Sequence, residues 1–469
     1  MLYRLEIDKK PKEPISFCLW EKINEHPKLE VRCYFDENKS NIQDLIYAEV
    51  KLFIENKLIF YGNIGKVIYD SELCQLFFSA WTKTKFYNLA KQTMIYGEGD
   101  IQRPVKELIS PLLNKFNVSQ TDLMVNKSYI LYQNNEKPFY FLAQILGEEN
   151  KAAYVEANTD KTFISDGNPT KTSELQKKDI ISCKISSSIK SSDFELKTWN
   201  TTNGKKSEPV IGKMNHHNSK ILSTLYKKTK PSSKDRNQLF AECIENTSQL
   251  IVNGYTNSKL SSLFKISLTT SVYNLSVGDG ITISNHPLQG EKLLICSSVL
   301  SYDPLNHINQ LKNDVECRIV TGNIPFDFVK KKQEYSQLLL GQVLSVNDPV
   351  KIGRVKVHFP FNTDNSGVWC RTLHASNRQF IIPKPNEFVY VIINSETSLP
   401  VVLGSINKTN SLPPAEIEDP EADLSFINPK DKDFEIYVKN GTIFLTSKKG
   451  ITIIGDTNIY GKVNIKEEK

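Results

Sequence analysis

The stretch GQVLSVNDPVKIGRVKVHFPF (residues 341–361) indicates the fold more clearly than any other part of this 469-residue chain. Apolar and basic residues alternate in it, the apolar ones being Val355, Val357 and Phe359 and the basic ones Arg354, Lys356 and His358. Such alternation predicts a strand with one buried and one solvated face. Similar runs lie at 369–373, 388–393 and 401–403, with glycines at their margins. Together these runs predict a compact five-stranded barrel of the OB type.

Alternating runs in the amino-terminal part of the chain predict a small antiparallel barrel. Residues 48–54 and 58–61 flank Glu55-Asn56-Lys57, which is the pattern of a β-hairpin. The layout of residues 50–70 returns at 281–303, where a strand, a turn and a second strand again end in Tyr-Asp. This repeat favours two copies of one barrel over a chance likeness between β-rich segments.

Helices are predicted between the two barrels. Apolar residues recur with the spacing of a helix face at Val105, Leu108, Ile109, Leu112 and Phe116. Pro111 within this run predicts a kink or two short helices. A further helix is predicted from about Pro138 to Leu146, ending at Gly147. The stretch 166–238 is rich in Ser, Lys, Thr and Asn, which predicts loops or strands with long excursions.

The carboxy-terminal part predicts a structure that needs other copies of the chain. Short apolar runs beyond residue 433 are separated by glycines at intervals near eight or nine residues. A segment of roughly 30 residues buries too little surface to fold alone, because chains below about 40 residues usually need staples or partners. A trimeric β-helix or prism is therefore predicted. Its predicted axial core is Phe434, Ile436, Val438, Ile443, Leu445, Ile451, Ile453 and Ile459.

The predicted fold class is mainly β, with two small tube-type barrels, helical insertions, an OB barrel and a short trimeric β-helix or prism. Proline, acidic residues and the lack of a period mark a linker before the carboxy-terminal segment. The predicted domains are a first β-barrel (1–90), a helical and mixed insertion with polar loops (91–239), a second β-barrel (240–330), the OB-fold (336–408), a linker (409–432) and a β-helix (433–465).

Charge and cysteine usage disfavour several classes of protein. Lysine and arginine number 59 against 53 acidic residues and form no basic stripe, which disfavours a dedicated nucleic-acid binder. The amino terminus lacks the pattern of a secretion signal, and no run is long and apolar enough to cross a bilayer. Eight scattered cysteines are typical of reduced thiols in a cytoplasmic fold.

No residue pattern predicts catalysis, a cofactor or a metal site. The seven histidines lack ligand spacing, and no Cys-x-x-Cys, His-Glu-x-x-His, Gly-x-Ser-x-Gly or phosphate-loop motif occurs. Glu148-Glu149 and the pair Asp433 and Glu435 are the nearest carboxylate pairs, and we interpret them as solvated charge. Trp369 could serve as a stacking platform for a single strand, but packing in a core or interface is the preferred interpretation.

The ordered motifs of the OB region resemble the barrel of VgrG proteins and phage baseplate spikes. VWCRTLHA (368–375), FIIPKPNEFVYV (380–391) and LPVVLGSINKTNSLPP (399–414) follow the first stretch in the order of that family. The sequence departs from the pattern at Asn386, where the family has a Gly-Asp turn, and at Phe388, where valine is usual. The residues that carry the resemblance are Asp348, Pro349, Gly353, Arg354, Val355, Trp369, Arg371, Pro383, Glu387 and Gly404.

The resemblance implies a structural spike of a type VI-like contractile injection system, neither an enzyme nor a cofactor-binding protein. A homotrimer with two barrels per chain would present six barrels to a hexameric tube-ring protein. The other implied partners are baseplate proteins, a conical PAAR-like tip protein and effectors, with transient contact to a target membrane and none to nucleic acid. Such a protein would be cytoplasmic on assembly and then injected without a signal peptide.

Two alternatives to this spike stay open. The first is the baseplate hub of a phage or phage-like extracellular contractile particle, which neighbouring genes would discriminate. The second is an OB-based nucleic-acid binder, which predicts affinity for single-stranded DNA that falls steeply with salt.

Overall fold

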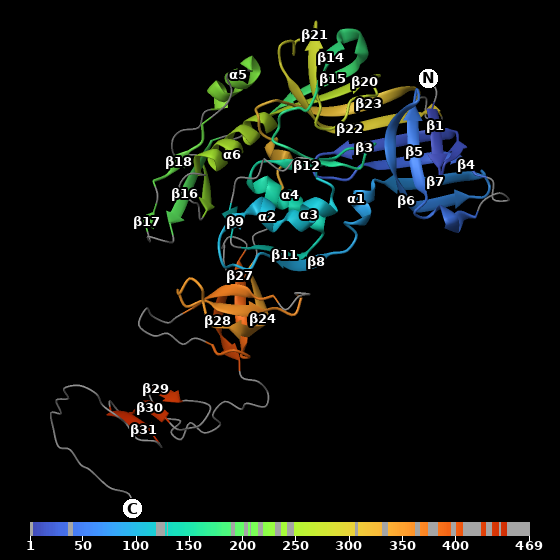
Figure 1. The fold of residues 1–469 in the computed structure, drawn as a ribbon. Coiled ribbons are helices and arrows are strands. Elements are labelled where there is room, and N and C mark those ends of the chain that lie inside the picture. The colour runs from blue at the N-terminus through green and yellow to red at the C-terminus, as the bar shows by residue number, and fades with distance from the viewer. Residues whose placement is uncertain are drawn as a thin grey trace, which may run out of the picture.

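The computed structural model describes residues 3–35, 41–118, 127–128, 130–188, 193–200, 205–206, 208–213, 219–229, 236–241, 248–304, 308–330, 336–361, 366–373, 383–394, 400–406, 424–427, 434–439 and 442–447. This part of the chain is mainly β, as predicted. Figure 1 shows a broad sheet with helices beside it, a small barrel and a terminal three-stranded sheet. No helix in the described ranges combines the length and apolar character needed to span a membrane.

The amino-terminal strands form one half of the broad sheet. The predicted hairpin is confirmed, because β5 pairs with β6 and the two residues between them, Glu55 and Asn56, have φ angles of 51° and 65°. Two left-handed residues make the tight turn that matches the twist of the paired strands. The strands are β1 (Tyr3–Ile7), β2 (Lys10–Lys12), β3 (Pro14–Lys22), β4 (Lys28–Tyr34), β5 (Glu49–Ile54), β6 (Lys57–Asp70) and β7 (Gln75–Trp81), with the 3-10 turn η1 (Ile42–Leu45) before β5.

The other half of the sheet comes from the middle of the chain. Its strands are β14 (Thr172–Gln176), β15 (Ile180–Ser187), β20 (Phe264–Thr270), β21 (Gly280–Ser284), β22 (Leu293–Asp303) and β23 (Ile308–Ile319). β22 pairs with β3, so both halves belong to one thirteen-stranded sheet. The domain prediction began the second unit at residue 240, whereas β14 and β15 come from the range assigned to the insertion. These two strands could not be predicted from the sequence, because their residues are mostly exposed and rich in Ser and Lys.

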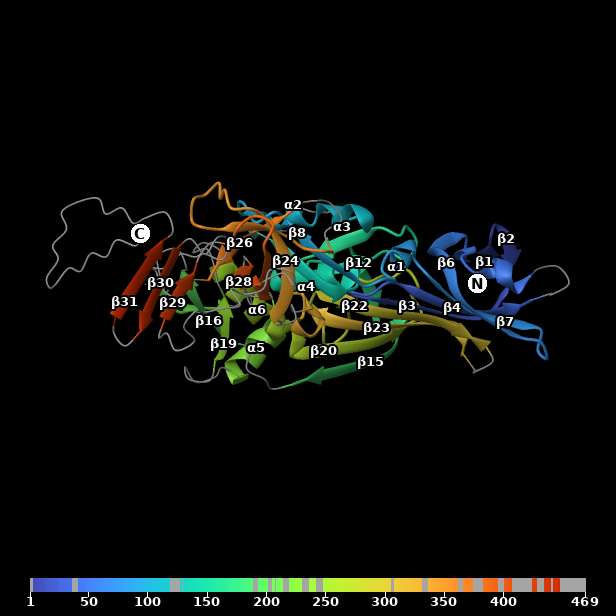
Figure 2. The same cartoon turned by 90° about the horizontal axis from the view of Figure 1, so that it is seen from below.

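The two halves of the sheet repeat one another. The order β3-β4-β7-β6-β5 in one half matches β15-β20-β23-β22-β21 in the other, and Figure 2 shows strands of both halves side by side. Each half has a bulge at the same place, where the register shifts between Ile64 and Lys66 in β6 and between Ile295 and Ser297 in β22. The bulges make Tyr69 equivalent to Leu300, two positions before the tyrosine that the sequence repeat suggested.

Helices pack beside the first half of the sheet. The predicted helix with Pro111 is two short helices that part at Ile109, and Pro111 lies in the first turn of the second. The predicted helix from Pro138 is confirmed as α4. Their core includes Phe116, Phe139 and Leu142. The elements are α1 (Lys83–Phe86), β8 (Gln92–Tyr96), β9 (Arg103–Pro104), α2 (Val105–Leu108), α3 (Ser110–Lys115), β10 (Lys127–Ser128), β11 (Leu131–Glu136), α4 (Pro138–Glu148), β12 (Ala152–Val155) and β13 (Thr162–Ser165).

A helix lies where the sequence predicted a return to β structure. α6 (Ser248–Ser262) buries Val252, Thr256 and Leu260, which are four residues apart. Only two of these three are apolar, so the stripe is too thin to predict a helix from periodicity. α6 covers a four-stranded sheet (Figure 1). The elements of this region are η2 (Lys177–Asp179), β16 (Phe194–Asn200), β17 (Lys205–Lys206), β18 (Val210–Ile211), α5 (Lys220–Thr229), β19 (Asn237–Ala241) and η4 (Phe326–Phe328).

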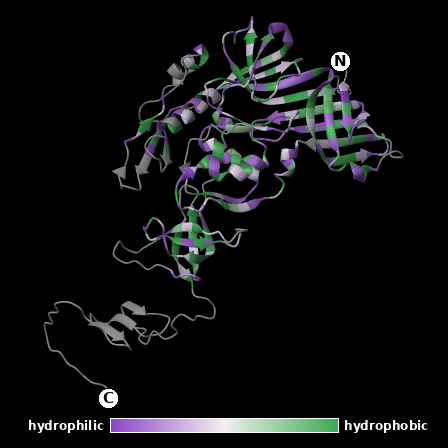
Figure 3. Ribbon diagram, in the orientation of Figure 1, coloured by the Kyte–Doolittle hydropathy of each residue, from purple (hydrophilic) through white to green (hydrophobic). Residues whose placement is uncertain are grey.

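The predicted OB barrel is confirmed as a closed five-stranded barrel of order β24-β25-β26-β28-β27. Val355, Val357 and Phe359 are fully buried in it, as their alternation predicted. Figure 3 shows the apolar character of these strands. The strands are β24 (Ser336–Ser345), β25 (Val355–His358), β26 (Val368–Thr372), β27 (Phe388–Asn394) and β28 (Val401–Ile406).

The described carboxy-terminal residues form an antiparallel sheet of β29 (Leu424–Ile427), β30 (Phe434–Lys439) and β31 (Thr442–Ser447). β29 lies within 409–432, which was predicted to be only a linker, so that prediction was wrong at these four residues. The strand is short and stands among prolines and acids, which left no readable period in the sequence.

Candidate functional site

The loop between β24 and β25 of the OB barrel closes around one carboxylate, that of Asp348. Its oxygens accept hydrogen bonds from the backbone N–H groups of Val350 at 3.0 Å, Ile352 at 2.9 Å and Arg354 at 3.2 Å. Gly353 makes the loop possible, because its φ of 79° is a left-handed conformation that glycine adopts without strain. Asp348, Gly353 and Arg354 were all named from the sequence, and the structure brings them together.

The guanidinium of Arg354 joins the OB barrel to the preceding part of the chain. It donates to Oδ1 of Asp348 from Nε at 3.1 Å and from Nη2 at 2.8 Å. Its Nη1 donates to the backbone carbonyl of Gly99 at 2.7 Å. The alternation predicted a solvated Arg354, but the residue is only 1% exposed. That prediction was wrong because the carboxylate and the carbonyl replace the water that the guanidinium loses.

The same junction holds Trp369, whose backbone N–H donates to the carbonyl of Glu98 at 2.8 Å. Its side chain faces the guanidinium of Arg354, 5.7 Å from the ring centroid, and the residue is 7% exposed. Lys356 donates to the carboxylate of Glu98 at 3.2 Å. A tryptophan so enclosed packs at an interface within the chain and is not open for a base to stack on.

Hydrogen bonding keeps the Asp348 carboxylate ionised. Burial alone would raise its pKa, but the bonds from Arg354 and from the backbone of Val350 and Ile352 outweigh burial and lower the pKa to about 2. The native pKa therefore lies below the ordinary value of about 3.9 for aspartate. The stabilisation that follows is complete above about pH 4 and is lost as the pH falls through about 2.

The other residues named from the OB motif lie elsewhere on the barrel. Pro383 is buried, and Glu387 accepts a hydrogen bond from the backbone N–H of Lys384 at 3.0 Å. Asn386 has a φ of 72°, a left-handed conformation that asparagine tolerates, so it can replace the family's Gly-Asp turn. Pro349, Arg371 and Gly404 are exposed. Among the described residues, no contact of the Pro349 or Arg371 side chain assigns it a role, and Gly404 has no side chain.

Five of the predicted axial residues occupy matching positions in the terminal sheet. Ile436 is paired with Leu445 and Val438 with Ile443, while Phe434 is paired with Ser447. Alternate positions of paired strands share one face of a sheet. Ile451, Ile453 and Ile459 lie outside the described residues. The axial role of these positions stays a prediction.

Sequence reasoning missed a pair of unfinished strand edges in the broad sheet. Leu19 of β3 and Ile185 of β15 occupy equivalent positions in the two halves. In each half, the residue that pairs with the strand just before the bulge can be followed across two neighbouring strands, and the pairing ends at Leu19 in one half and at Ile185 in the other. Leu19 pairs with Leu300 of β22 and is 1% exposed, whereas Ile185 is 44% exposed. Within the described part of the chain, no strand pairs with β15 on its outer side.

The complementary edge lies on β6. Its residues 66–68 pair with β7 on one side, and among the described residues no strand pairs with them on the other. Ile68 there is 53% exposed. The equivalent stretch of β22 is where β3 pairs. One chain thus contains one finished junction, the pairing of β22 with β3, and the two strand edges, on β6 and β15, of an unfinished junction of the same kind. Only a comparison of the strand register in the two halves of the sheet reveals this.

No cluster of three or more histidine, cysteine, aspartate or glutamate side chains suited to a metal ion occurs in the described ranges. Among the histidines that the structure describes, His26 has the most perturbed environment. Burial, followed by the charges of Lys85 and Lys137, lowers its pKa to about 3. Its ring bonds Thr84 Oγ1 at 3.0 Å and Asn88 Nδ2 at 3.2 Å, and these bonds hold the imidazole in a buried hydrogen-bond network.

Comparison with known proteins gives one family match and a shared fold. Residues 339–406 match the family described as the type VI secretion system/phage-baseplate injector OB domain. The E. coli c3393 protein is a type VI secretion component with structural similarity to T4 bacteriophage tail proteins gp27 and gp5. It is 10% identical and superposes with a TM-score of 0.56 over 86% of this chain and 99% of its own.

Chains of PdpA-VgrG complexes have the same fold. In the half-lidded Francisella complex the match is 12% identical with a TM-score of 0.54, over 95% of this chain and 83% of the other. In the lidless complex it is 11% identical with a TM-score of 0.55, over 94% and 97%. A search of curated proteins finds no match.

Proposed function

We propose that this chain, whose fold is that of the VgrG-like spike proteins, is a structural hub and spike of a contractile injection machine and acts as a homotrimer. The observation that carries this proposal is the unfinished junction on β6 and β15. Each chain uses the junction once, between β22 and β3, and leaves its two halves open. Pairing β6 of one copy with β15 of the next would repeat the internal junction between copies.

Burial at equivalent positions supports this pairing. The finished junction covers Leu19, while the unfinished one leaves Ile185 and Ile68 exposed. An exposed apolar strand edge invites pairing with another chain, so a stable protein must cover it. Three chains with two β units each give a ring of six units. Such a ring has the symmetry needed to sit on a hexameric tube-ring protein, while the OB barrels and terminal sheets keep threefold symmetry.

The proposed role of the OB barrel and terminal sheet is mechanical. The buried contact of Arg354 with Asp348 and Gly99 ties the barrel to the body of the chain at several points. A force along the spike would therefore reach the hub through hydrogen bonds that water does not reach. In this role the trimer is held by baseplate proteins and carries a conical tip protein or effectors. It crosses a target membrane when the machine contracts. This role requires neither catalysis nor a signal peptide.

Imaging of the purified protein tests the proposal. Electron microscopy with native mass measurement should show an elongated trimer whose wide end is a ring of six like units. A single-chain species at micromolar concentration would contradict the homotrimer, and a trimer without a ring would contradict the pairing of β6 with β15.

A phage-like particle is the second candidate, favoured by the likeness of the c3393 protein to T4 tail proteins. Both candidates use the same trimer, so they differ only in the machine. Isolation of the assembled machine through a tag on this chain separates them: a membrane-anchored secretion complex supports the first candidate, and free extracellular particles support the second.

A further inference from the structure

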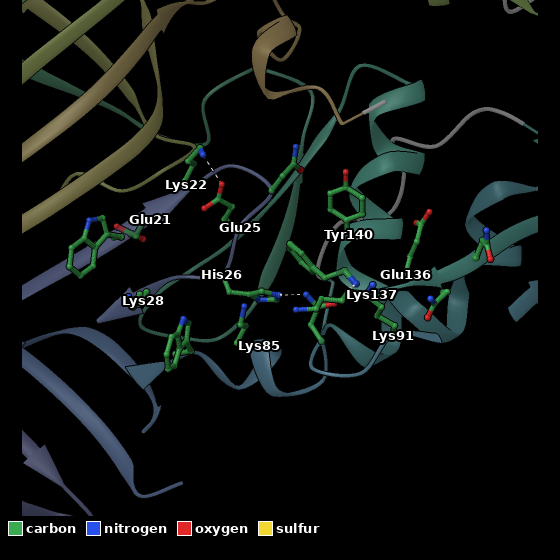
Figure 4. A pocket seen from close by; sticks show the side chains of 17 residues that line it. Glu21, Lys22, Glu25, His26, Lys28, Lys85, Lys91, Glu136, Lys137 and Tyr140 are labelled. Atoms are coloured by element: carbon green, nitrogen blue, oxygen red, sulfur yellow. Dashed lines mark hydrogen bonds and ion pairs between the residues drawn. The ribbon is translucent and has the colours of Figure 1, made fainter. Parts of the chain in front are cut away.

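A pocket of about 820 Å³ lies between the first half of the sheet and the helices beside it. Figure 4 shows it lined by side chains from β3 and β4 on one side and from α1, β11 and α4 on the other. Its volume is within the range of about 300–1,000 Å³ that is usual for ligand sites. Neither the OB junction nor the unfinished strand edges use any residue of this pocket.

Lysine is the prominent side chain of the pocket. Five lysines and three glutamates line it. Lys22 is paired with Glu25 at 2.6 Å, and Lys28 with Glu30 at 2.5 Å. Within the part of the chain that the structure describes, the other three lysines, Lys85, Lys91 and Lys137, have no carboxylate at ion-pair distance. The pocket therefore holds positive charge that the described residues do not balance.

The positive charges of Lys85 and Lys137 repel one another. Burial, and next the charge of Lys137, lowers the pKa of Lys85. The polar side chains of His26 and Asn88 in the pocket do not compensate these charges, because they are already bonded to each other and to Thr84 and the backbone of Phe139. An anion placed beside Lys85 and Lys137 would remove this repulsion.

The remaining walls of the pocket favour a peptide over a simple ion. Trp20, Trp81, Phe139 and Tyr140 give aromatic surface, and Asn134 and Asn135 give amides that can bond peptide groups. The charges of Glu25 and Glu136 would repel a continuous phosphate backbone, but single carboxylates of a peptide can be spaced to meet only the lysines. Charge and shape thus select a short chain that carries acids and an aromatic or apolar residue.

We propose that this pocket is a docking site for a short acidic peptide segment of a partner protein. Lys85 and Lys137 bind its carboxylates, while the tryptophans contact its apolar side chain. Hydrogen bonds between a lysine and a carboxylate are charge-assisted and stronger than bonds between neutral groups. Loss of both lysines should therefore weaken binding at least about tenfold.

The test uses the full-length protein and a fluorescein-labelled peptide of sequence Glu-Glu-Trp-Glu-Glu, followed by fluorescence anisotropy. We expect saturable binding that weakens with added salt, at least about tenfold weaker binding of the Gln-Gln-Trp-Gln-Gln peptide, and the same loss in Lys85→Gln/Lys137→Gln. Lys161→Gln/Lys292→Gln is the matched control, because it removes equal charge at exposed sites outside the pocket. It should bind within about twofold of the parent protein.

Several results would overturn the proposal. These are no binding of the glutamate peptide, equal binding of the glutamine peptide, equal loss in the control protein, or full competition by citrate at the peptide's own affinity. The last result would assign the pocket to a small anion. Lys137→Gln alone guards against a folding defect, because its side chain is exposed and makes no cap bond to α4. It should still weaken binding.

Discussion

Arg354 is buried at a boundary between two parts of the chain, where charges are rarely found without partners. Its guanidinium is 1% exposed and meets the carboxylate of Asp348, whose side chain is 4% exposed. Removing one member of a buried ion pair leaves the other without compensation, which typically costs about 3–5 kcal/mol. The pair therefore matters more for the attachment of the barrel than exposed pairs such as Lys22 and Glu25 do.

Asp348→Asn should lower the stability of the OB barrel by about 3–5 kcal/mol, because Arg354 would stay buried without a counter-charge. Thermal unfolding followed by tryptophan fluorescence measures this, since Trp369 lies at the junction. Asp166→Asn is the control: its carboxylate also accepts a backbone hydrogen bond, from Asn168 at 2.9 Å, but at the surface and without arginine. Equal effects of the two substitutions would remove the special role of the buried pair.

Glu21 should make the stability of the protein depend on pH near neutrality. Burial, and then the charges of Asp279 and Glu156, raises its pKa to about 8. Because the native pKa exceeds that of the unfolded chain, the folded state binds more protons between about pH 4.3 and 8. The free energy of unfolding should therefore fall as pH rises through this range, by up to about 1.4 kcal/mol per pH unit.

Urea unfolding of the parent protein and of Glu21→Gln at pH 5, 6, 7 and 8 checks this. The substitution should flatten the pH dependence. Glu25→Gln, at an exposed site in the same pocket, should leave it in place. A parent protein whose stability does not change over this range would contradict the burial of an ionisable Glu21.

Single residues show where reasoning from the sequence stops. The period of two placed Val355 and Val357 in the barrel core correctly, because burial on one face of a strand is a local property. The same period placed Arg354 in solvent, since nothing local reveals that the carbonyl of Gly99, 255 residues earlier, would receive its N–H group. Glu21 escaped notice for a like reason, because its burial arises from distant segments.

Among the elements, β15 is the strand whose environment in one chain is incomplete. Ile185→Asp should weaken association of the chains at least about a hundredfold, because the lost burial of an isoleucine is worth about 1.5–3 kcal/mol and a buried carboxylate adds its desolvation. Native mass measurement over a dilution series would follow the trimer. Ile211→Asp is a matched control, since Ile211 is also 44% exposed but lies on β18, outside the broad sheet.

The control should stay trimeric at concentrations where Ile185→Asp dissociates. If both proteins remain trimeric, β15 is not at the interface between copies. If both dissociate, the effect comes from added charge and not from the position of the strand.

Elements with a strong period were predictable, and those with a weak one were not. The OB strands, the β5–β6 hairpin and α4 have regular apolar spacing or turn residues with a specific conformation. α6 buries polar residues such as Thr256 and Asn257, so its spacing carries little hydrophobic signal. β14 and β15 are mostly exposed in one chain, and strands of this kind show no alternation to read.

For the whole molecule, the terminal segment is expected to depend on the assembly. Ile443→Asp/Leu445→Asp should abolish trimers on native mass measurement. Both positions belong to the predicted axial core, where each of the three chains would bury the charges of its two aspartates. Lys439→Asp/Thr442→Asp, at the end of the same hairpin, is the control. Retention of trimers by the first protein would refute the axial assignment.

The plan of the molecule was predictable in its parts and less so in their joining. The internal repeat pointed to two β units, but no residue pattern showed that β22 pairs with β3 and fuses them into one sheet. Pairing between strands about 280 residues apart depends on edge geometry that a single sequence does not display. The OB junction is similar, since Gly99, whose carbonyl accepts the N–H of Arg354, lies in a segment that carries no recognisable motif.

The pairing of β22 with β3 also bears on how a ring could be built. In the proposed arrangement, half of the six contacts around the ring are already made when each polypeptide folds. Three chains then join by only two bimolecular associations, where six separate subunits would need five, and each association avoided spares the translational and rotational entropy of bringing free partners together. Fusing two copies of an ancestral unit in one gene would thus let the ring form at lower cellular concentrations than six separate subunits need.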